Sequence, residues 1–347
     1  MKAAVYHGRN EINCEEVEKP RIGEGEVLVK VAVCGVCPTD IKKIEHGLLE
    51  PPRIFGHEIA GVIEEVGAGV RDWKIGERVA VHHHIPCEKC HYCENGNYSM
   101  CETYKKTGTT AGFEPSGGGF AEYVRVLPWI VEKGMVRIPE DVSFEEASFV
   151  EPVNTCLKGI RRLGIRKNHV VMVFGQGAIG LILIQLAKLE GATTVGIDLM
   201  DERLKIARGF GAHHVFNPKE VDLKEEIKKI TGGRGADAAV IAAPSNKAIA
   251  QAVQAIRNGG KILLFAQTEQ GSILEIDASE ICRNEKDLIG SYSASVKLQE
   301  EVAEIVFRRE INVKDLITHK FSLEEAGAAI KLAANPTGNS LKVIIEP

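Results

Sequence analysis

Four cysteines lie at short, regular spacing in the first third of the chain, in the pattern C-x2-C-x2-C-x7-C. Four thiolates close a tetrahedral structural zinc site with no open position, at Zn–S distances of about 2.3 Å. An iron–sulfur cluster or four unrelated thiols are the alternatives. The surrounding segment 86–102, called the lobe below, is too polar to have its own core, so bound metal would supply most of its folding free energy. The predicted ligands are Cys87, Cys90, Cys93 and Cys101, and His91 between them is predicted to be exposed.

Three further segments carry the ligand types of an open, catalytic metal site. A catalytic zinc takes about three protein ligands and keeps one position for water or substrate. CGVCPTD, FGHEIAG and FVEPVN together offer a thiolate, an imidazole and carboxylates. Taken singly, Cys34 is predicted to be a small buried hydrophobe, and a lone histidine would more often be structural. The candidate ligands are Cys37, His57, Glu58 and Glu151.

A glycine-rich turn, VVMVFGQGAIG, follows an apolar run and opens an apolar helix. In G-x-G-x-x-G the first glycine permits a tight turn, the second admits a pyrophosphate and the third lets helix pack on strand. The helix N-terminus offers free N–H groups to the phosphates. Asp198, 18 residues past Gly180, can bind both adenosine ribose hydroxyls and repel a 2′-phosphate, which favours NAD over NADP. Arg203 could stack on adenine, meet a phosphate or be a surface charge. The predicted cofactor-binding residues are Gly175, Gln176, Gly177, Ala178, Ile179, Gly180, Asp198 and Arg203.

The elements that must position these residues differ between two parts of the chain. Up to about residue 155, short alternating runs bounded by turn residues predict a compact, largely β, barrel-like domain. Beyond it, strands and helices alternate, which predicts a parallel sheet covered on both faces. Glycines just past the helices are predicted to be left-handed caps; these are Gly191, Gly211 and the pair Gly259–Gly260. Strands are expected at 27–33, 59–67, 78–84, 121–126, 170–174, 193–198, 213–216, 236–243 and 261–266.

Length and composition exclude several classes of protein. The 347 residues predict roughly two domains, and 44% apolar with 26% charged residues is ordinary globular usage. A net charge of −5 does not fit the basic domains that usually bind nucleic acid. No run approaches the roughly 18 consecutive apolar residues that a membrane helix needs. The N-terminal residues lack the apolar region of a secretory signal. We therefore expect a cytoplasmic protein with no nucleic-acid or membrane partner, in which regularly spaced cysteines bind metal.

Together, these motifs resemble the zinc-dependent medium-chain dehydrogenases, the superfamily of alcohol, sorbitol and threonine dehydrogenases. The resemblance covers nearly the whole chain in the family's order, through GVCPTD, GHEIAGVIEEVGAGV with KIGERV, the lobe, GGGFAEY, VEP and GQGAIG. It implies an α/β chain with a GroES-like, largely β catalytic domain (1–154 and 294–347). A Rossmann domain with a doubly wound parallel sheet (155–293) would bind the coenzyme. The implied cofactors are NAD and two Zn²⁺ ions, one catalytic and one structural.

The resemblance also assigns the catalytic metal site residue by residue. Cys37, His57 and Glu151 match the catalytic zinc ligands. Glu58 matches a carboxylate behind the zinc that can exchange with water as a ligand. Asp40 matches an acid that orients the ligand histidine.

Proton transfer and substrate choice show both matches and departures. Thr39 matches the hydroxyl that takes the substrate proton. Lys42 stands where many relatives carry a histidine relay, so His46 or bulk water could replace that group. Segment 290–295, GSYSAS, matches the strand edge whose backbone holds the nicotinamide amide, but it lacks the arginine of sorbitol-active relatives, which argues against sorbitol. The histidine run 82–84 is interpreted as structural, because side chains alternate faces along a strand.

The leading hypothesis is a zinc-containing, NAD-dependent dehydrogenase that oxidises a small secondary alcohol or polyol to the ketone. L-threonine 3-dehydrogenase-like activity and a non-catalytic nucleotide-binding zinc protein are the alternatives. The resemblance also implies self-association, because edge strands expected near 273–277 and 288–293 pair across a two-fold axis in the family; the sequence does not choose between a homodimer and a homotetramer.

Overall fold

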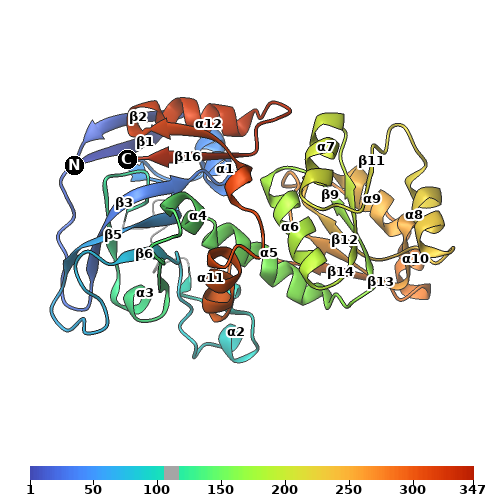
Figure 1. Cartoon of the computed structure of the whole chain (residues 1–347), viewed down its shortest axis with the longest axis horizontal. Helices are drawn as coiled ribbons and strands as arrows, with labels where there is room; N and C mark the ends of the chain where they lie inside the picture. Colours follow the sequence, from blue (N-terminus) through green and yellow to red (C-terminus); the bar gives the residue numbers. More distant parts are fainter. Residues whose placement is uncertain (105–116) are drawn as a thin grey trace. The chain divides into compact units, whose positions relative to one another are not determined.

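The computed structural model describes residues 1–104 and 117–347. The chain divides into two compact units, Met1–Asn154 with Ala294–Pro347, and Thr155–Ser293. Both termini therefore belong to the first unit, as Figure 1 shows. No helix in the described ranges is long and apolar enough to cross a bilayer.

The first unit is built on two sheets. The larger has the order β15-β16-β3-β5-β6-β8, with β7 pairing to β3, and the smaller has the order β2-β1-β4. Its strands are β1 (Lys2–Gly8), β2 (Glu11–Glu16), β3 (Val27–Gly35), β4 (Arg53–Ile54), β5 (Glu58–Val66), β6 (Arg78–Val81), β7 (Tyr123–Val126), β8 (Met135–Arg137), β15 (Ile317–Ser322) and β16 (Lys342–Glu346). Its helices are α1 (Pro38–His46), α2 (His91–Glu94), α3 (Pro128–Lys133), α4 (Phe144–Ser148), α11 (Gln299–Phe307) and α12 (Ala326–Ala334), with short 3₁₀ turns at Tyr98–Met100, Val296–Leu298, Lys314–Leu316 and Leu323–Glu325.

Strand β3 carries the first metal-binding segment into place. Its residues are almost all apolar and buried, because β5, β7 and β16 pair with it and the unit's core packs against it. Cys34 near its end is fully buried in that core, as predicted. Two residues beyond the strand, Cys37 is the N-cap of α1, and Pro38 occupies the first helical position, where its missing N–H costs no hydrogen bond.

The second unit is a six-stranded parallel sheet with the order β11-β10-β9-β12-β13-β14. In Figure 1, α6 covers the sheet on one side and α8 to α10 on the other. The strands are β9 (Val170–Phe174), β10 (Thr193–Ile197), β11 (His214–Phe216), β12 (Ala236–Ile241), β13 (Ile256–Leu264) and β14 (Asp287–Gly290). The helices are α6 (Ala178–Leu189), α7 (Asp201–Gly209), α8 (Leu223–Thr231), α9 (Asn246–Ala255) and α10 (Ala278–Arg283); α5 (Val150–Leu163) begins in the first unit and ends in the second.

The structure confirms the alternation of strands and helices and corrects three details. Gly191 and Gly211 follow α6 and α7 with φ of +77° and +96°. The pair Gly259–Gly260 is not a cap: α9 passes directly into an extended Ile256, and both glycines lie inside β13. Residues 273–277 form no strand, so β14 is the edge of the sheet there. The predicted strand 78–84 ends at Val81.

Candidate active site and metal centres

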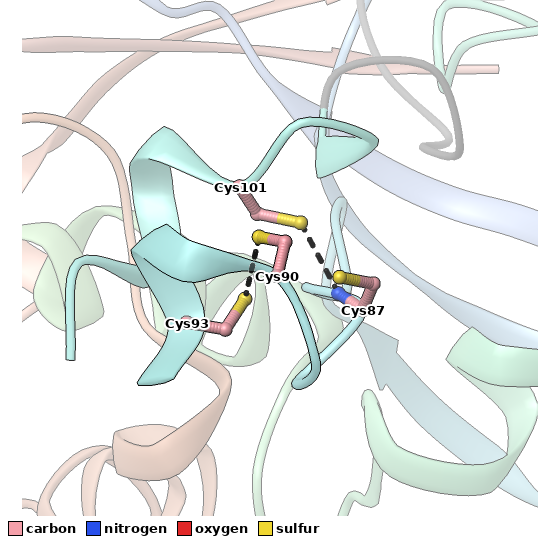
Figure 2. Close-up of side chains that lie close together, drawn as sticks. All are labelled: Cys87, Cys90, Cys93 and Cys101. Carbon is pink, nitrogen blue, oxygen red and sulfur yellow. Dashed lines mark hydrogen bonds between the residues drawn. The ribbon is translucent and has the colours of Figure 1, made fainter. Parts of the chain in front are cut away.

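The four lobe cysteines converge on one point. One candidate ligand atom from each lies within 4.8 Å of the others. The sulfurs of Cys90 and Cys93 are 3.6 Å apart, and the Cys87 N–H donates to the sulfur of Cys101 over 3.2 Å (Figure 2). Helix α2 places two of the ligands, because Cys90 is its N-cap and Cys93 lies within it. His91 is exposed, as predicted.

The ionisation of these thiols fits a bound divalent cation. Burial raises the pKa of Cys93 to about 12, and the neighbouring sulfurs of Cys90 and Cys101 add to the shift. Burial acts in the same sense on Cys101, but hydrogen bonds from the Cys87 N–H and from Thr103 outweigh it and lower the pKa to about 6. Four thiolates cannot coexist here without a counter-charge, and Zn²⁺ supplies that charge with matching ligand preference. In the described part of the chain, the hydrophobic cluster around the four cysteines contains just Tyr98 and Tyr104 besides them, so the donor set fits structural zinc.

Cys37 and His57, two of the predicted ligands of a second metal, lie close to each other. Nδ1 of His57 lies 3.1 Å from Oδ1 of the fully buried Asp40, which leaves Nε2 to act as a ligand. Burial lowers the pKa of His57, but the charges of Asp40 and Cys37 outweigh it and raise that pKa well above its ordinary value. The Cys37 thiol is also within hydrogen-bonding reach of the ring. The Cys37 side chain and an oriented imidazole thus meet, and these are two ligand types that zinc accepts.

Glu58 is held by a residue from the other end of the chain. Its carboxylate is 1% exposed and forms an ion pair with Lys342, at the start of β16, whose Nζ also donates to the Val36 carbonyl over 3.0 Å. Burial disfavours the lysine charge, but Glu58 and Cys37 outweigh it and raise the pKa of Lys342. In this arrangement, the carboxylate of Glu58 is bound by a cation of the protein itself.

Replacing Lys342 by methionine is expected to lower the free energy of unfolding by about 3 kcal/mol, because it leaves a buried carboxylate unpaired. Urea unfolding of the purified protein measures this change. The double variant Lys342→Met/Glu58→Gln should recover part of the loss, because no charge is then left buried. A single variant as stable as the unmodified protein would contradict the assignment.

Glu151 lies in the first turn of α5 and is 7% exposed. Burial raises its pKa to about 7; the charge of Glu58 adds to this effect and that of His57 opposes it. A cation at this position would restore the ionised carboxylate. The charges of His57 and Glu58 therefore both reach Glu151, which places these three predicted ligands near one another.

The histidine run 82–84 does not lie on a strand, because β6 ends at Val81. The argument from alternating faces therefore fails, and all three side chains are buried. The rings of His57 and His83 have centroids 5.4 Å apart, and Nδ1 of His83 lies 3.6 Å from Oε1 of Glu151. His83 is thus beside two predicted ligands, a placement that the sequence reading missed.

The predicted catalytic ligands lie less close to one another than the four lobe cysteines do. Across residues 1–104 and 117–347, the lobe cysteines are the one group of three or more His, Cys, Asp or Glu side chains whose ligand atoms all lie within 4.8 Å of one another. Cys37 and His57 meet, Glu58 is paired with Lys342, and Glu151 lies beside His83. The sulfur, nitrogen and oxygen donors of the set nevertheless suit a catalytic zinc with an open position.

In the second unit, the glycine turn connects β9 to α6 as the motif requires. Gly175 has φ of +92°, and a Cβ on Gly180 would lie 1.8 Å from the Gly175 carbonyl oxygen, so neither position accepts a side chain. The Gln176 side chain donates to the Val173 carbonyl over 2.7 Å. It therefore faces the sheet, and the backbone of residues 177–180 is left to face a ligand.

Asp198 and Arg203 flank this turn. Asp198 follows β10 and accepts hydrogen bonds from the N–H groups of Gln176 (2.7 Å) and Met200 (3.0 Å), which fix its orientation. A Cβ on Gly177 would lie 3.6 Å from Nη1 of Arg203. Within the described part of the chain, the buried Nε of Arg203 has no hydrogen-bond partner. Arg203 is thus half-buried beside the turn rather than a surface charge.

Comparison with known proteins agrees with this arrangement. The profile of the alcohol dehydrogenase GroES-like domain matches residues 23–140, and that of the zinc-binding dehydrogenases matches residues 178–309. Sorbitol dehydrogenase of Bacillus subtilis (strain 168) is 33% identical over 353 residues, covering 100% of this chain and 97% of that protein. An alcohol dehydrogenase of Geobacillus stearothermophilus is 37% identical over 325 residues, covering 91% of each.

A solved structure is similar over the same length. A zinc-binding dehydrogenase of Sinorhizobium meliloti 1021 bound to NADP has a TM-score of 0.90 and 29% identity, and the match covers 100% of this chain and 99% of that one. Fold, sequence and donor sets therefore agree. The chain belongs to the zinc-dependent medium-chain dehydrogenase superfamily, with a GroES-like domain and a Rossmann domain.

Proposed function

We propose that this protein oxidises a secondary alcohol or polyol to the ketone, with NAD as hydride acceptor. The observation that carries the proposal is the meeting of Cys37 with an Asp40-oriented His57 in a chain that also has a complete nucleotide-binding turn. The names of the sorbitol and alcohol dehydrogenases that it resembles support the substrate class.

The site residues divide into groups that bind the cofactors and groups that move the proton. Cys37, His57 and Glu151 would hold the catalytic zinc, and the lobe would hold a structural zinc. When bound, zinc acts as a Lewis acid that lowers the pKa of the substrate hydroxyl, and nicotinamide accepts the hydride. Thr39, exposed in the first turn of α1, would accept the hydroxyl proton. Burial lowers the pKa of Lys42, one turn further on, which is the direction that a proton relay near neutral pH needs.

The cofactor is proposed to be NAD because of Asp198. Its two backbone hydrogen bonds leave lone pairs for the adenosine ribose hydroxyls, and its charge opposes a 2′-phosphate. Asp198→Ala is expected to weaken NAD binding about tenfold and to lower the preference for NAD over NADP, because it removes charged hydrogen bonds and a repulsion. Steady-state kinetics with both cofactors measure the ratio.

Asp201→Ala is the matched control for that variant. Asp201 is an exposed carboxylate three residues away, in the first turn of α7. Its replacement by alanine should leave the preference for NAD over NADP unchanged. An unchanged ratio in the Asp198 variant as well would overturn the assignment to NAD.

A substrate screen tests the reaction itself. NADH formation would be followed with NAD, added zinc and a panel of secondary alcohols, polyols, sugars and L-threonine. Turnover on an alcohol or polyol that is lost on chelation would support the proposal. Turnover confined to L-threonine would instead identify the protein as an amino-alcohol dehydrogenase.

A further inference from the structure

Lys158, in the second unit, binds backbone carbonyl groups away from the predicted metal ligands and the glycine turn. Lys158 is a half-buried residue of α5. Its Nζ donates to the carbonyl oxygens of Tyr292 (2.8 Å) and Ser293 (3.3 Å), more than 130 residues further along the chain. These carbonyls lie just beyond β14, which ends at Gly290. Lys158 thus holds the first residues of the chain after the edge strand.

The backbone held by Lys158 has an unusual conformation. Ser293 has φ of +62°, in the left-handed region that residues other than glycine rarely occupy. Two successive carbonyl groups are therefore directed at one ammonium group. A trans peptide directs its N–H opposite to its C=O, so the Ser293 N–H points away from Lys158. A Cβ on Gly290 would have nothing within 4 Å, so open space lies beside the strand end.

The topology of the sheet indicates which part of a dinucleotide reaches this edge. The strand order reverses at β9, and ligands of such sheets lie across the carboxyl ends of the strands at that point. Asp198, after β10, marks the side of the adenosine ribose. The nicotinamide half must then lie on the side of β12, β13 and β14, where residues 291–293 follow the last strand.

We infer that Lys158 is a positioning residue that fixes the peptide between Tyr292 and Ser293 in the orientation needed to bind the nicotinamide end of the cofactor. The inference rests on the proposed use of a nicotinamide cofactor. The ammonium would act on the cofactor through the backbone that it holds. Burial, together with a smaller effect of Arg162, lowers the pKa of Lys158 to about 8. The surroundings therefore disfavour the lysine charge, and the two carbonyl groups are contacts that stabilise it.

The test compares two ligands that differ only at the nicotinamide end. NADH and ADP-ribose share the adenosine, both riboses and the pyrophosphate, so both depend on the glycine turn and Asp198. Calorimetric titration would give Kd values for both ligands with the full-length, zinc-loaded protein. Lys158→Met removes the donors at similar length, Lys158→Arg keeps a cationic donor, and Arg162→Met removes an exposed cation one turn further along α5.

The expected result is a selective loss at the nicotinamide end. Lys158→Met should weaken NADH binding about tenfold or more, with ADP-ribose binding changed less than about twofold. Lys158→Arg should recover most of the NADH affinity, and Arg162→Met should match the unmodified protein. Unchanged NADH binding, or an equal loss for both ligands, would overturn the inference, because the lysine would then be dispensable or merely structural. Failure of the unmodified protein to bind NADH would instead refute the proposed function.

Discussion

Cys37→Ser is expected to lower NAD-dependent alcohol oxidation about a thousandfold or more. A serine hydroxyl stays protonated at neutral pH and is a poor zinc ligand, so the metal next to His57 would be lost. The fold should be preserved, because the structural contribution of Cys37 is its backbone carbonyl, which accepts the N–H groups of Asp40 (3.0 Å) and Ile41 (3.2 Å). Serine is moreover a favourable N-cap for α1. The NADH formation rate, the zinc content and the Kd for NADH are the quantities to measure.

The zinc content separates a lost catalytic metal from general damage. The unmodified protein should hold about two ions per chain and the variant about one, with unchanged NADH binding. Cys282→Ser, which removes an exposed thiol in α10 of the second unit, is the matched control and should keep both ions and full activity. Full turnover in Cys37→Ser would show that Cys37 is not a ligand of a catalytic zinc.

The second unit could be predicted closely because its signals are local. Short buried runs such as Val170–Phe174, each followed by an amphipathic or apolar helix, determine the alternation without reference to the rest of the chain. The errors arise where a local rule has two outcomes. A glycine pair after a helix can be a cap or part of a strand, and Gly259–Gly260 lie in β13 because α9 has already ended at Ala255.

The site could be predicted where ligand spacing is short and not where partners are distant in sequence. Cys87 to Cys101 lie within one short segment, so the spacing alone indicated that their sulfurs meet. Lys342 contacts residues about 300 positions earlier, and Lys158 binds carbonyls more than 130 positions later. Only the topology brings such partners together, as when β16 pairs with β3. His83 was missed for a different reason, since the strand assumed to carry it ends at Val81.

Cys101→Ser is expected to unfold the lobe while leaving the two units folded. The described hydrophobic cluster here holds just two tyrosines besides the cysteines, so bound zinc would provide most of the stability of the lobe. Structural zinc is worth roughly 10 kcal/mol in zinc-finger peptides at neutral pH. Losing a ligand should therefore raise the population of the open lobe by several orders of magnitude. Limited trypsin digestion measures this, because Lys89 is an exposed cleavage site between two of the cysteines.

Cleavage after Lys89 should thus be rapid in Cys101→Ser and slow in the unmodified protein, and a chelator that strips both metals should reproduce the effect. The lobe is also fixed to the rest of its unit by Glu88, which pairs with Lys133 (2.5 Å) and Lys297 (2.6 Å). These exposed ion pairs contribute about 1 kcal/mol or less each and cannot replace the metal. Glu88→Gln should therefore leave the lobe resistant to trypsin. If Glu88→Gln opened the lobe as readily as Cys101→Ser, the ion pairs rather than zinc would hold it, and the structural metal site would have to be abandoned.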